Sequence, residues 1–176
     1  MKFFFLTLIF FSSLTKLSAY TQKQLEILQT VRNVARTIPD KKGETYENTM
    51  SAICLVESSA GKYLIGDFRE GVKVTRASLG ILQVQVPTAK YVISKTPSLF
   101  YLKKYNDFQL ANLLLTNIVV ATKIATNYLV MLIESRPTYY NGVSGYNGGF
   151  RNIKYFNRVK TQLKRVYKLI KQNKLI

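Results

Sequence analysis

The chain has no histidine among its 176 residues and only one cysteine, Cys54. Without histidine, Ser-His-Asp and Cys-His catalysis in their usual forms are excluded, as are the common zinc sites that contain histidine. A single cysteine also excludes an internal disulfide. Because no histidine can activate its thiol, we interpret Cys54 as a small buried hydrophobe. We therefore expect no cofactor and no metal site.

The N-terminus carries an almost wholly apolar run, Phe3 to Phe11, which follows the basic start Met1-Lys2 and leads to Leu17-Ser18-Ala19, with small residues at its end. This order is typical of a secretory signal peptide, which we expect to be cleaved after Ala19. The run is too short to cross a bilayer, since a spanning helix needs about 20 residues. We predict a signal peptide over 1–19, one domain over 20–176, and a periplasmic location.

Acidic residues are scarce, with 9 Asp and Glu against 26 Lys and Arg, and the formal net charge is +17. Such a charge favours anionic polymers or membrane surfaces as partners. Nucleic acid is compatible with the charge, but export argues against it. The charge therefore indicates the sign of a partner and not its identity.

Apolar periodicity predicts a mainly α fold, a helical bundle around a long buried central helix with a small β-like flap. We expect helices over 20–38, from about Tyr46 to Ser58, around Gln83, after Pro87, from Asn106 to about Ile133, and over 152–172. The apolar stretch before Ile133 is interrupted by amides and a lysine, which favours burial inside a globular domain over membrane insertion. Residues 62–76 have the texture of a hairpin, and residues 139–149 that of a loop rich in Gly, Tyr and Asn.

Glu57 is the first candidate catalytic residue, because it ends an uncharged segment of a predicted helix. Met50, Ile53 and Cys54 lie seven, four and three residues before it, so all would share its inward face. Burial would raise the pKa of the carboxyl group, as a general acid requires. A helix-end glutamate that reaches solvent or pairs with an arginine fits the same position, and position alone does not decide between the two.

Three motifs follow one another in the chain: Glu57-Ser58; Ser78-Leu79-Gly80-Ile81-Leu82-Gln83 with Pro87-Thr88-Ala89; and Gly145-Tyr146-Asn147-Gly148-Gly149. In this order they resemble the soluble lytic transglycosylase family (the SLT domain, glycoside hydrolase family 23), whose fold is lysozyme-like. The resemblance covers roughly residues 46–166. It implies an α+β lysozyme-like domain that cleaves the β-1,4 bond between N-acetylmuramic acid and N-acetylglucosamine.

The resemblance also implies roles for individual residues. Glu57 matches the single catalytic acid and base, which protonates the leaving oxygen and then lets the sugar's own C6 hydroxyl close a 1,6-anhydro ring. Gln83 matches a cleft residue that binds substrate, Gly80 a point of close approach, and Ser78 a polar residue near the sugar. Tyr146 matches the tyrosine that orients the catalytic carboxyl group, and Asn147 the asparagine that fixes the loop.

Each assignment has an alternative based on ordinary structure. Gln83 could be a surface amide, Tyr146 a core ring, Ser78 a helix cap, and Ser58 helix-end chemistry. The segment Asp67-Phe68-Arg69-Glu70-Gly71 resembles an enlarged flap, and either acid in it could supply a second carboxylate. Glu134-Ser135 also ends an apolar run, but Arg136 beside it indicates a helix-end ion pair.

The resemblance therefore implies a peptidoglycan lytic transglycosylase that acts on glycan strands, and we expect a monomer without stable membrane insertion. Small members of the family suggest recruitment by secretion or conjugation machinery. A hydrolytic muramidase on the same fold remains an alternative, as does a basic wall-binding protein without catalytic activity.

Overall fold

The computed structural model describes residues 20–67, 69–71 and 73–176; the predicted signal peptide, Phe68 and Val72 lie outside the described residues. The fold is mainly α, as predicted, with one small sheet. In chain order its elements are α1 (Gln22–Ala35), α2 (Glu47–Ser58), β1 (Ile65–Gly66), the 3₁₀ helix η1 (Val74–Arg76), β2 (Ser78–Leu79), α3 (Val86–Lys95), the 3₁₀ helix η2 (Pro97–Leu102), α4 (Asp107–Thr116), α5 (Ile118–Ser135), α6 (Tyr139–Tyr146) and α7 (Ile153–Lys171).

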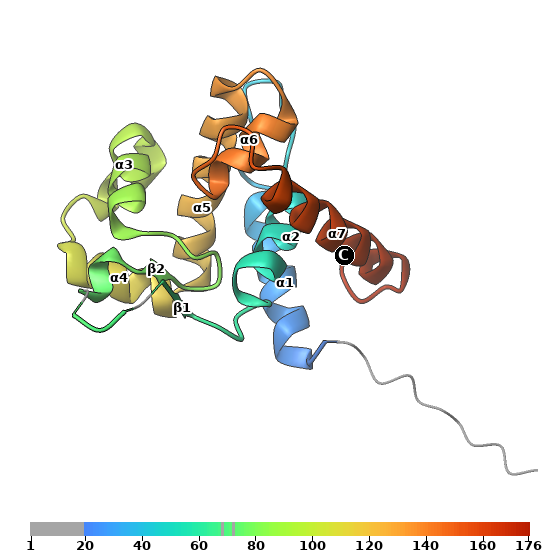
Figure 1. The fold of residues 1–176 in the computed structure, drawn as a ribbon, viewed down its shortest axis with the longest axis horizontal. Helices are drawn as coiled ribbons and strands as arrows, with labels where there is room; N and C mark the ends of the chain where they lie inside the picture. Colours follow the sequence, from blue (N-terminus) through green and yellow to red (C-terminus); the bar gives the residue numbers. More distant parts are fainter. Residues whose placement is uncertain (1–19, 68, 72) are drawn as a thin grey trace, which may run out of the picture.

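Helix α5 lies at the centre of the fold, between a part formed by α3, α4 and the small sheet and a part formed by α1, α2 and α7 (Figure 1). Its buried face includes Ala121, Ile124 and Leu129, and it packs against α1, α3, α4 and α6. In length and composition it could also cross a membrane. Here its apolar side chains, together with the buried Thr122, form part of the core of the bundle.

The prediction of one helix from Asn106 to Ile133 is wrong, because the chain breaks at Asn117. Its backbone is extended (φ −110°, ψ 94°), and its side chain accepts a hydrogen bond from the Val120 amide, so it begins α5. The predicted capping pair is confirmed: Asn106 and Gln109 exchange side-chain and backbone hydrogen bonds at the start of α4. The longest described helix is consequently α7.

The sheet is a short hairpin in which Ile65 pairs with Leu79 and Gly66 with Ser78, antiparallel. The predicted flap over 62–76 thus supplies one strand, and its partner lies beyond the predicted range. The helix predicted around Gln83 is absent. Leu79 forms an isolated bridge with Val84, and the turn between them places Gln83 at a positive φ of 49°.

Helix α6 replaces the loop predicted for the segment rich in glycine and tyrosine. Thr138 begins the helix by accepting a hydrogen bond from the Asn141 amide. The absence of a side chain at Gly142 allows α6 to approach α5, because a Cβ there would come within 2.6 Å of the Ile133 Cγ1. Glycine serves close helix packing here rather than loop flexibility.

Helix α7 matches the prediction closely and forms its most extensive contacts with α2. Asn152 begins it by accepting a hydrogen bond from the Tyr155 amide, and Tyr155, Val159 and Val166 are buried in the core. Because α2 carries Glu57, the packing of α7 on α2 determines what lies behind that carboxyl group.

Candidate active site

Glu57 lies in the last turn of α2, which ends where Ser59 adopts the left-handed conformation. Its Oε1 accepts a hydrogen bond of 2.5 Å from the hydroxyl of Tyr155 on α7. Burial raises the pKa of Glu57 above its ordinary value, and the charge of Asp67 acts in the same direction. The Tyr155 hydrogen bond and the charge of Arg158 lower that pKa, but burial is the larger effect. The site therefore favours the protonated form that a general acid needs.

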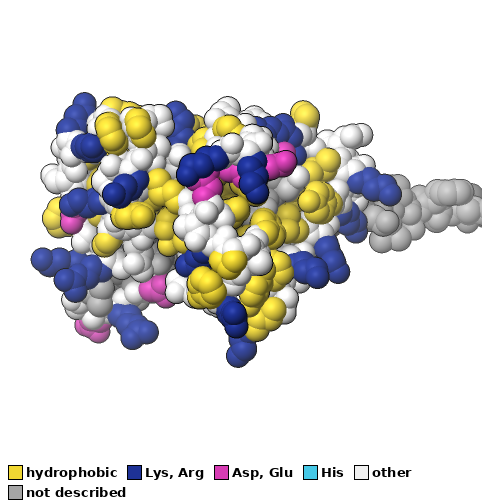
Figure 2. All heavy atoms as spheres, turned by 90° about the horizontal axis from the view of Figure 1, so that it is seen from above, with side chains coloured by type: hydrophobic (Ala, Val, Ile, Leu, Met, Phe, Trp, Pro, Cys, Tyr) yellow, Lys and Arg dark blue, Asp and Glu magenta, His cyan; other side chains and the backbone are white. Residues whose placement is uncertain are grey.

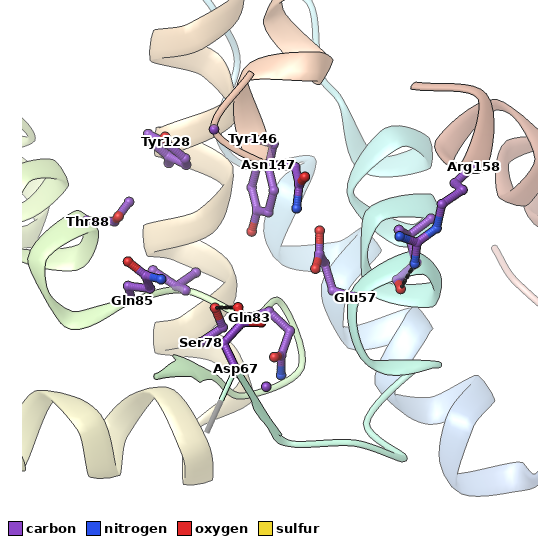
Figure 3. A pocket seen from close by; sticks show the side chains of 14 residues that line it. Glu57, Asp67, Ser78, Gln83, Gln85, Thr88, Tyr128, Tyr146, Asn147 and Arg158 are labelled. Atoms are coloured by element: carbon purple, nitrogen blue, oxygen red, sulfur yellow. Dashed lines mark hydrogen bonds between the residues drawn. The ribbon is translucent and has the colours of Figure 1, made fainter. Parts of the chain in front are cut away.

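A cavity of about 470 Å³ opens in front of Glu57. In Figure 3, Glu57 and Arg158 lie on one side, Gln85 and Thr88 on the other, Tyr146 and Asn147 above, and Asp67 and Ser78 below. The lining is mostly polar: Val56, Glu57, Gly66, Asp67, Ser78, Gln83, Val84, Gln85, Thr88, Tyr128, Tyr146, Asn147, Gly148 and Arg158. A cavity rich in amides and hydroxyls that holds a carboxyl group of raised pKa suits a neutral, hydroxylated ligand.

The structure brings Gln83 to this cavity, as expected, but on a turn instead of a helix. The Gln83 amide nitrogen donates to the carbonyl of Gly80 at 2.8 Å and to that of Tyr63 at 3.3 Å. A Cβ on Gly66 would collide with the Gln83 side chain, so that glycine leaves room for it. Gln83 thus joins the hairpin to the cavity wall.

Ser78 and Asp67 also line the cavity, and the Ser78 hydroxyl donates to the Asp67 carboxylate at 3.1 Å. The suggestion that the enlarged flap brings a second carboxylate to the site is therefore supported for Asp67. Glu70, the other acid of that segment, is not part of the cavity lining. Ser78 begins no helix, because it lies in β2, so its interpretation as a helix cap is wrong.

The hydrogen bond between Tyr146 and the Glu57 carboxyl group that the resemblance implies is not formed among the described residues. The Tyr146 hydroxyl instead donates to the backbone carbonyl of Leu82 at 2.9 Å, while its ring lies 5.6 Å from that of Tyr128. Tyr146 thus joins α6 to the turn that carries Gln83. The hydroxyl that contacts Glu57 belongs to Tyr155.

Gly80 does not line the cavity, and its predicted role in close approach of the substrate is wrong. It has a positive φ of 74°, and a Cβ there would overlap the backbone carbonyl of Leu114 on α4. The close approach is therefore between two parts of the protein. Asn147 does line the cavity, and its side-chain oxygen accepts a hydrogen bond from Asn152 at 3.1 Å, which connects the ends of α6 and α7.

Sequence reasoning gave no site role to five polar residues that line the cavity or contact Glu57: Tyr155, Arg158, Gln85, Thr88 and Tyr128. Thr88 lay within a quoted motif and Tyr128 on a predicted core helix, but neither had a distinguishing signal. Tyr155 directly precedes Phe156, the first residue of the predicted apolar stripe, and is not part of that stripe. Its side chain is nonetheless only 2% exposed, and only the packing of α7 on α2 reveals its contact with Glu57.

Two other residues singled out in the sequence have structural roles. Ser58 is fully buried; its hydroxyl donates to the carbonyl of Ile81 at 2.7 Å and accepts from the amide of Gly61 at 2.8 Å, which is helix-end chemistry. Glu134 forms an ion pair with Lys41, and not with Arg136 as predicted. Neither residue lines the cavity.

Cys54 is buried beneath the site, and burial raises the pKa of its thiol to about 12, which agrees with an unreactive core residue.

Within the described part of the chain, no group of three or more His, Cys, Asp or Glu could hold a metal ion. Comparison with known proteins adds no relative: no family model, no curated protein and no solved structure matches this chain.

Proposed function

We propose that this chain is an exported peptidoglycan lytic transglycosylase with a lysozyme-like fold and Glu57 as its only general acid and base. Glu57 protonates the glycosidic oxygen between N-acetylmuramic acid and N-acetylglucosamine. It then accepts the proton of the C6 hydroxyl as the 1,6-anhydro ring closes. No water is consumed, and no second carboxylate is needed, because the substrate supplies its own nucleophile.

The observation that carries this proposal is the position of Glu57. Its carboxyl group lies in a polar cavity of about 470 Å³, and burial raises its pKa. Glycosidases in general place a general acid of raised pKa beside the scissile oxygen. Gln83, Gln85 and Asn147 line the same cavity, and amides can both donate to and accept from sugar hydroxyl and acetamido groups.

Digestion of purified peptidoglycan, followed by mass analysis of the muropeptides, tests the proposal. The expected product is an anhydro-muramoyl end, which is lighter by one water than a hydrolysed end. Glu57→Gln should abolish cleavage while binding to the wall persists. Glu134→Gln is the matched control, because Glu134 also ends a helix but lies outside the cavity. If Glu57→Gln cleaves as fast as the wild type, the proposal is wrong.

A hydrolytic muramidase is the second candidate, and the position of Asp67 favours it. A carboxylate facing the acid across a cavity can activate a water molecule, as in inverting glycosidases. Ser78 donates a hydrogen bond to Asp67, which holds that carboxylate in the cavity wall. If Asp67 is the base, the products carry an added water and Asp67→Asn abolishes turnover. If the C6 hydroxyl closes the anhydro ring instead, Asp67→Asn still cleaves the strand and the product is still an anhydro sugar.

A basic wall-binding protein without catalysis is the third reading. If the chain is such a protein, peptidoglycan binds to it and stays intact in the digestion assay. Recruitment by secretion or conjugation machinery is compatible with each reading.

A further inference from the structure

Helix α7 contains no acidic residue but seven lysines and arginines exposed to solvent: Lys154, Arg158, Lys160, Lys164, Arg165, Lys168 and Lys171. Among the charged side chains on the face shown in Figure 2, Lys and Arg predominate, and Asp and Glu are few. A solvated helix face alone would tolerate charges of both signs. The single sign along α7 therefore indicates attraction to an anion.

The cations of α7 lie along two flanks of the helix. One flank begins at Lys154. Three further cations follow it at offsets of four, eleven and fourteen residues, which places them on the same side of the helix: Arg158, Arg165 and Lys168. We call these four residues the inner flank. Lys160, Lys164 and Lys171 lie on the other side, which we call the outer flank.

Two residues of the inner flank, Lys154 and Arg158, line a second cavity of about 430 Å³ between α2 and α7, and Arg165 and Lys168 continue the flank along the helix beyond it. Its lining consists of Leu55, Val56, Ser59, Lys154, Asn157, Arg158, Thr161 and Gln162. Val56 and Arg158 also line the cavity of Glu57, so the two cavities adjoin. The Arg158 guanidinium donates to the Val56 carbonyl at 3.1 Å and separates one cavity from the other.

No carboxylate in this second cavity balances its positive charge, because none of its lining residues is acidic. Among the described residues, the ion pairs join Arg36 to Glu47, Lys41 to Glu134, and Lys90 to Asp107, and none includes the inner flank. Arg165 is held by a neutral partner, since its guanidinium donates to the Gln162 side chain at 3.3 Å. Arg158 acts on Glu57 through its charge, whereas Lys154, Arg165 and Lys168 form no ion pair with a described carboxylate.

We infer that the inner flank binds the carboxylates of the peptide branches on the glycan strand that occupies the Glu57 cavity. This inference rests on the proposed function, because it requires that strand to be peptidoglycan. A branched strand bound at Glu57 would project its peptide from the cavity, and the adjoining positive cavity lies next to it. The preferred substrate is then a strand with free peptide carboxylates rather than one with amidated peptides.

Binding to one batch of soluble strands before and after conversion of the peptide carboxylates to amides tests the inference. Conversion with carbodiimide and ammonium removes the charge and leaves the glycan unchanged. Binding is measured with the full chain carrying Glu57→Gln, so that the strands stay intact. Lys154→Gln combined with Arg165→Gln removes two charges from the inner flank, and Lys160→Gln with Lys171→Gln removes two from the outer flank.

The inner-flank pair should weaken binding of the carboxylate strands about threefold to tenfold, as expected for two exposed charge contacts. On amidated strands the inner-flank chain and the outer-flank chain should bind alike. Equal weakening by both pairs, or equal weakening on both substrates, overturns the inference. A membrane preference would also overturn the inference. In that case the chain binds phosphatidylglycerol vesicles more tightly than strands, and only the double substitution Lys154→Gln with Arg165→Gln abolishes vesicle binding.

Cleavage by the wild-type chain separates this inference from the proposed function. If the wild type forms anhydro products at equal rates from carboxylate and amidated strands, the inference fails and the proposed function stands. If the wild type cleaves neither substrate, the proposed function fails, whatever the binding data show.

Discussion

Tyr155→Phe tests the geometry of the site most directly, because it removes one hydroxyl and keeps a ring that is only 2% exposed. The lost hydrogen bond of 2.5 Å is the one that holds the Glu57 carboxyl group. A hydrogen bond to a charged group contributes about 1.5–3 kcal/mol. Since each 1.4 kcal/mol or so corresponds to a tenfold change in rate, kcat should fall about tenfold to hundredfold. KM should change little, because Tyr155 does not line the cavity.

The pH profile of Tyr155→Phe carries a signature that a merely structural role would lack. The Tyr155 hydroxyl lowers the pKa of Glu57, so its removal raises that pKa further. Cleavage begins with protonated Glu57 and is lost as the pH rises through its pKa, so the alkaline limb of kcat/KM should move to higher pH. An alkaline limb that stays in place, together with an unchanged kcat, would refute the idea that Tyr155 positions Glu57.

Two tyrosine variants serve as controls for Tyr155→Phe. Tyr167→Phe removes an exposed hydroxyl from the same helix, and its activity should stay within about twofold of the wild type. Tyr146→Phe removes the 2.9 Å hydrogen bond to the Leu82 carbonyl and should cost about 1 kcal/mol of stability without moving the alkaline limb. If Tyr146→Phe moves the limb and Tyr155→Phe does not, the sequence-based assignment is right.

Three further predictions concern stability. Gly80→Ala should lower the free energy of unfolding in urea by about 2–5 kcal/mol, because it combines a positive φ with a clash at Leu114; a loss below about 1 kcal/mol would contradict this packing. Ser58→Ala should cost about 1–3 kcal/mol in the same assay, since it leaves the Ile81 carbonyl and the Gly61 amide unpaired. Glu57→Gln should raise Tm at neutral pH. The pKa of Glu57 is higher in the folded state than its ordinary value of 4.5, so the wild type loses stability as the pH rises from 4.5 through the folded-state pKa, whereas glutamine does not ionise. The Tm difference should shrink below pH 4.5 and would contradict the burial argument if it grew there.

The sequence predicted helices well where local signals agreed with the packing. The apolar stripe of α7 and the capping pair of α4 follow from residues close together in the chain, and both are confirmed. Asn117 illustrates the opposite case. An asparagine inside an apolar run can lie on a helix face or begin a new helix, and the extended backbone of Asn117 shows that it begins one. In α6, Gly142 allows close contact with α5 and Gly145 leaves room for the Arg136 side chain, although both glycines suggested a loop.

The site was predictable as far as its residues lie in recognisable motifs. Glu57, Ser78, Gln83, Tyr146 and Asn147 all line the cavity, although they come from three separate segments. Their individual contacts were not predictable, because each depends on how distant helices pack. Tyr146 and Tyr155 are both tyrosines near the acid in the fold, and the sequence offers no means to decide which hydroxyl reaches it.

The two faces of α7 have different roles: one contacts the catalytic acid, and the other carries the exposed positive charges. On the inward face, Tyr155 contacts the acid while Val159 and Val166 fix the helix on the core. On the exposed face, Lys154 and Arg165 point away from that core. An inward substitution should therefore alter kcat and the pH profile, whereas an outward one should alter affinity for charged strands and leave the pH profile in place. Arg158 lies where the faces meet: its charge lowers the pKa of Glu57, and its side chain borders both cavities. Arg158→Gln should consequently change both properties at once, which a helix that serves only as scaffold would not do.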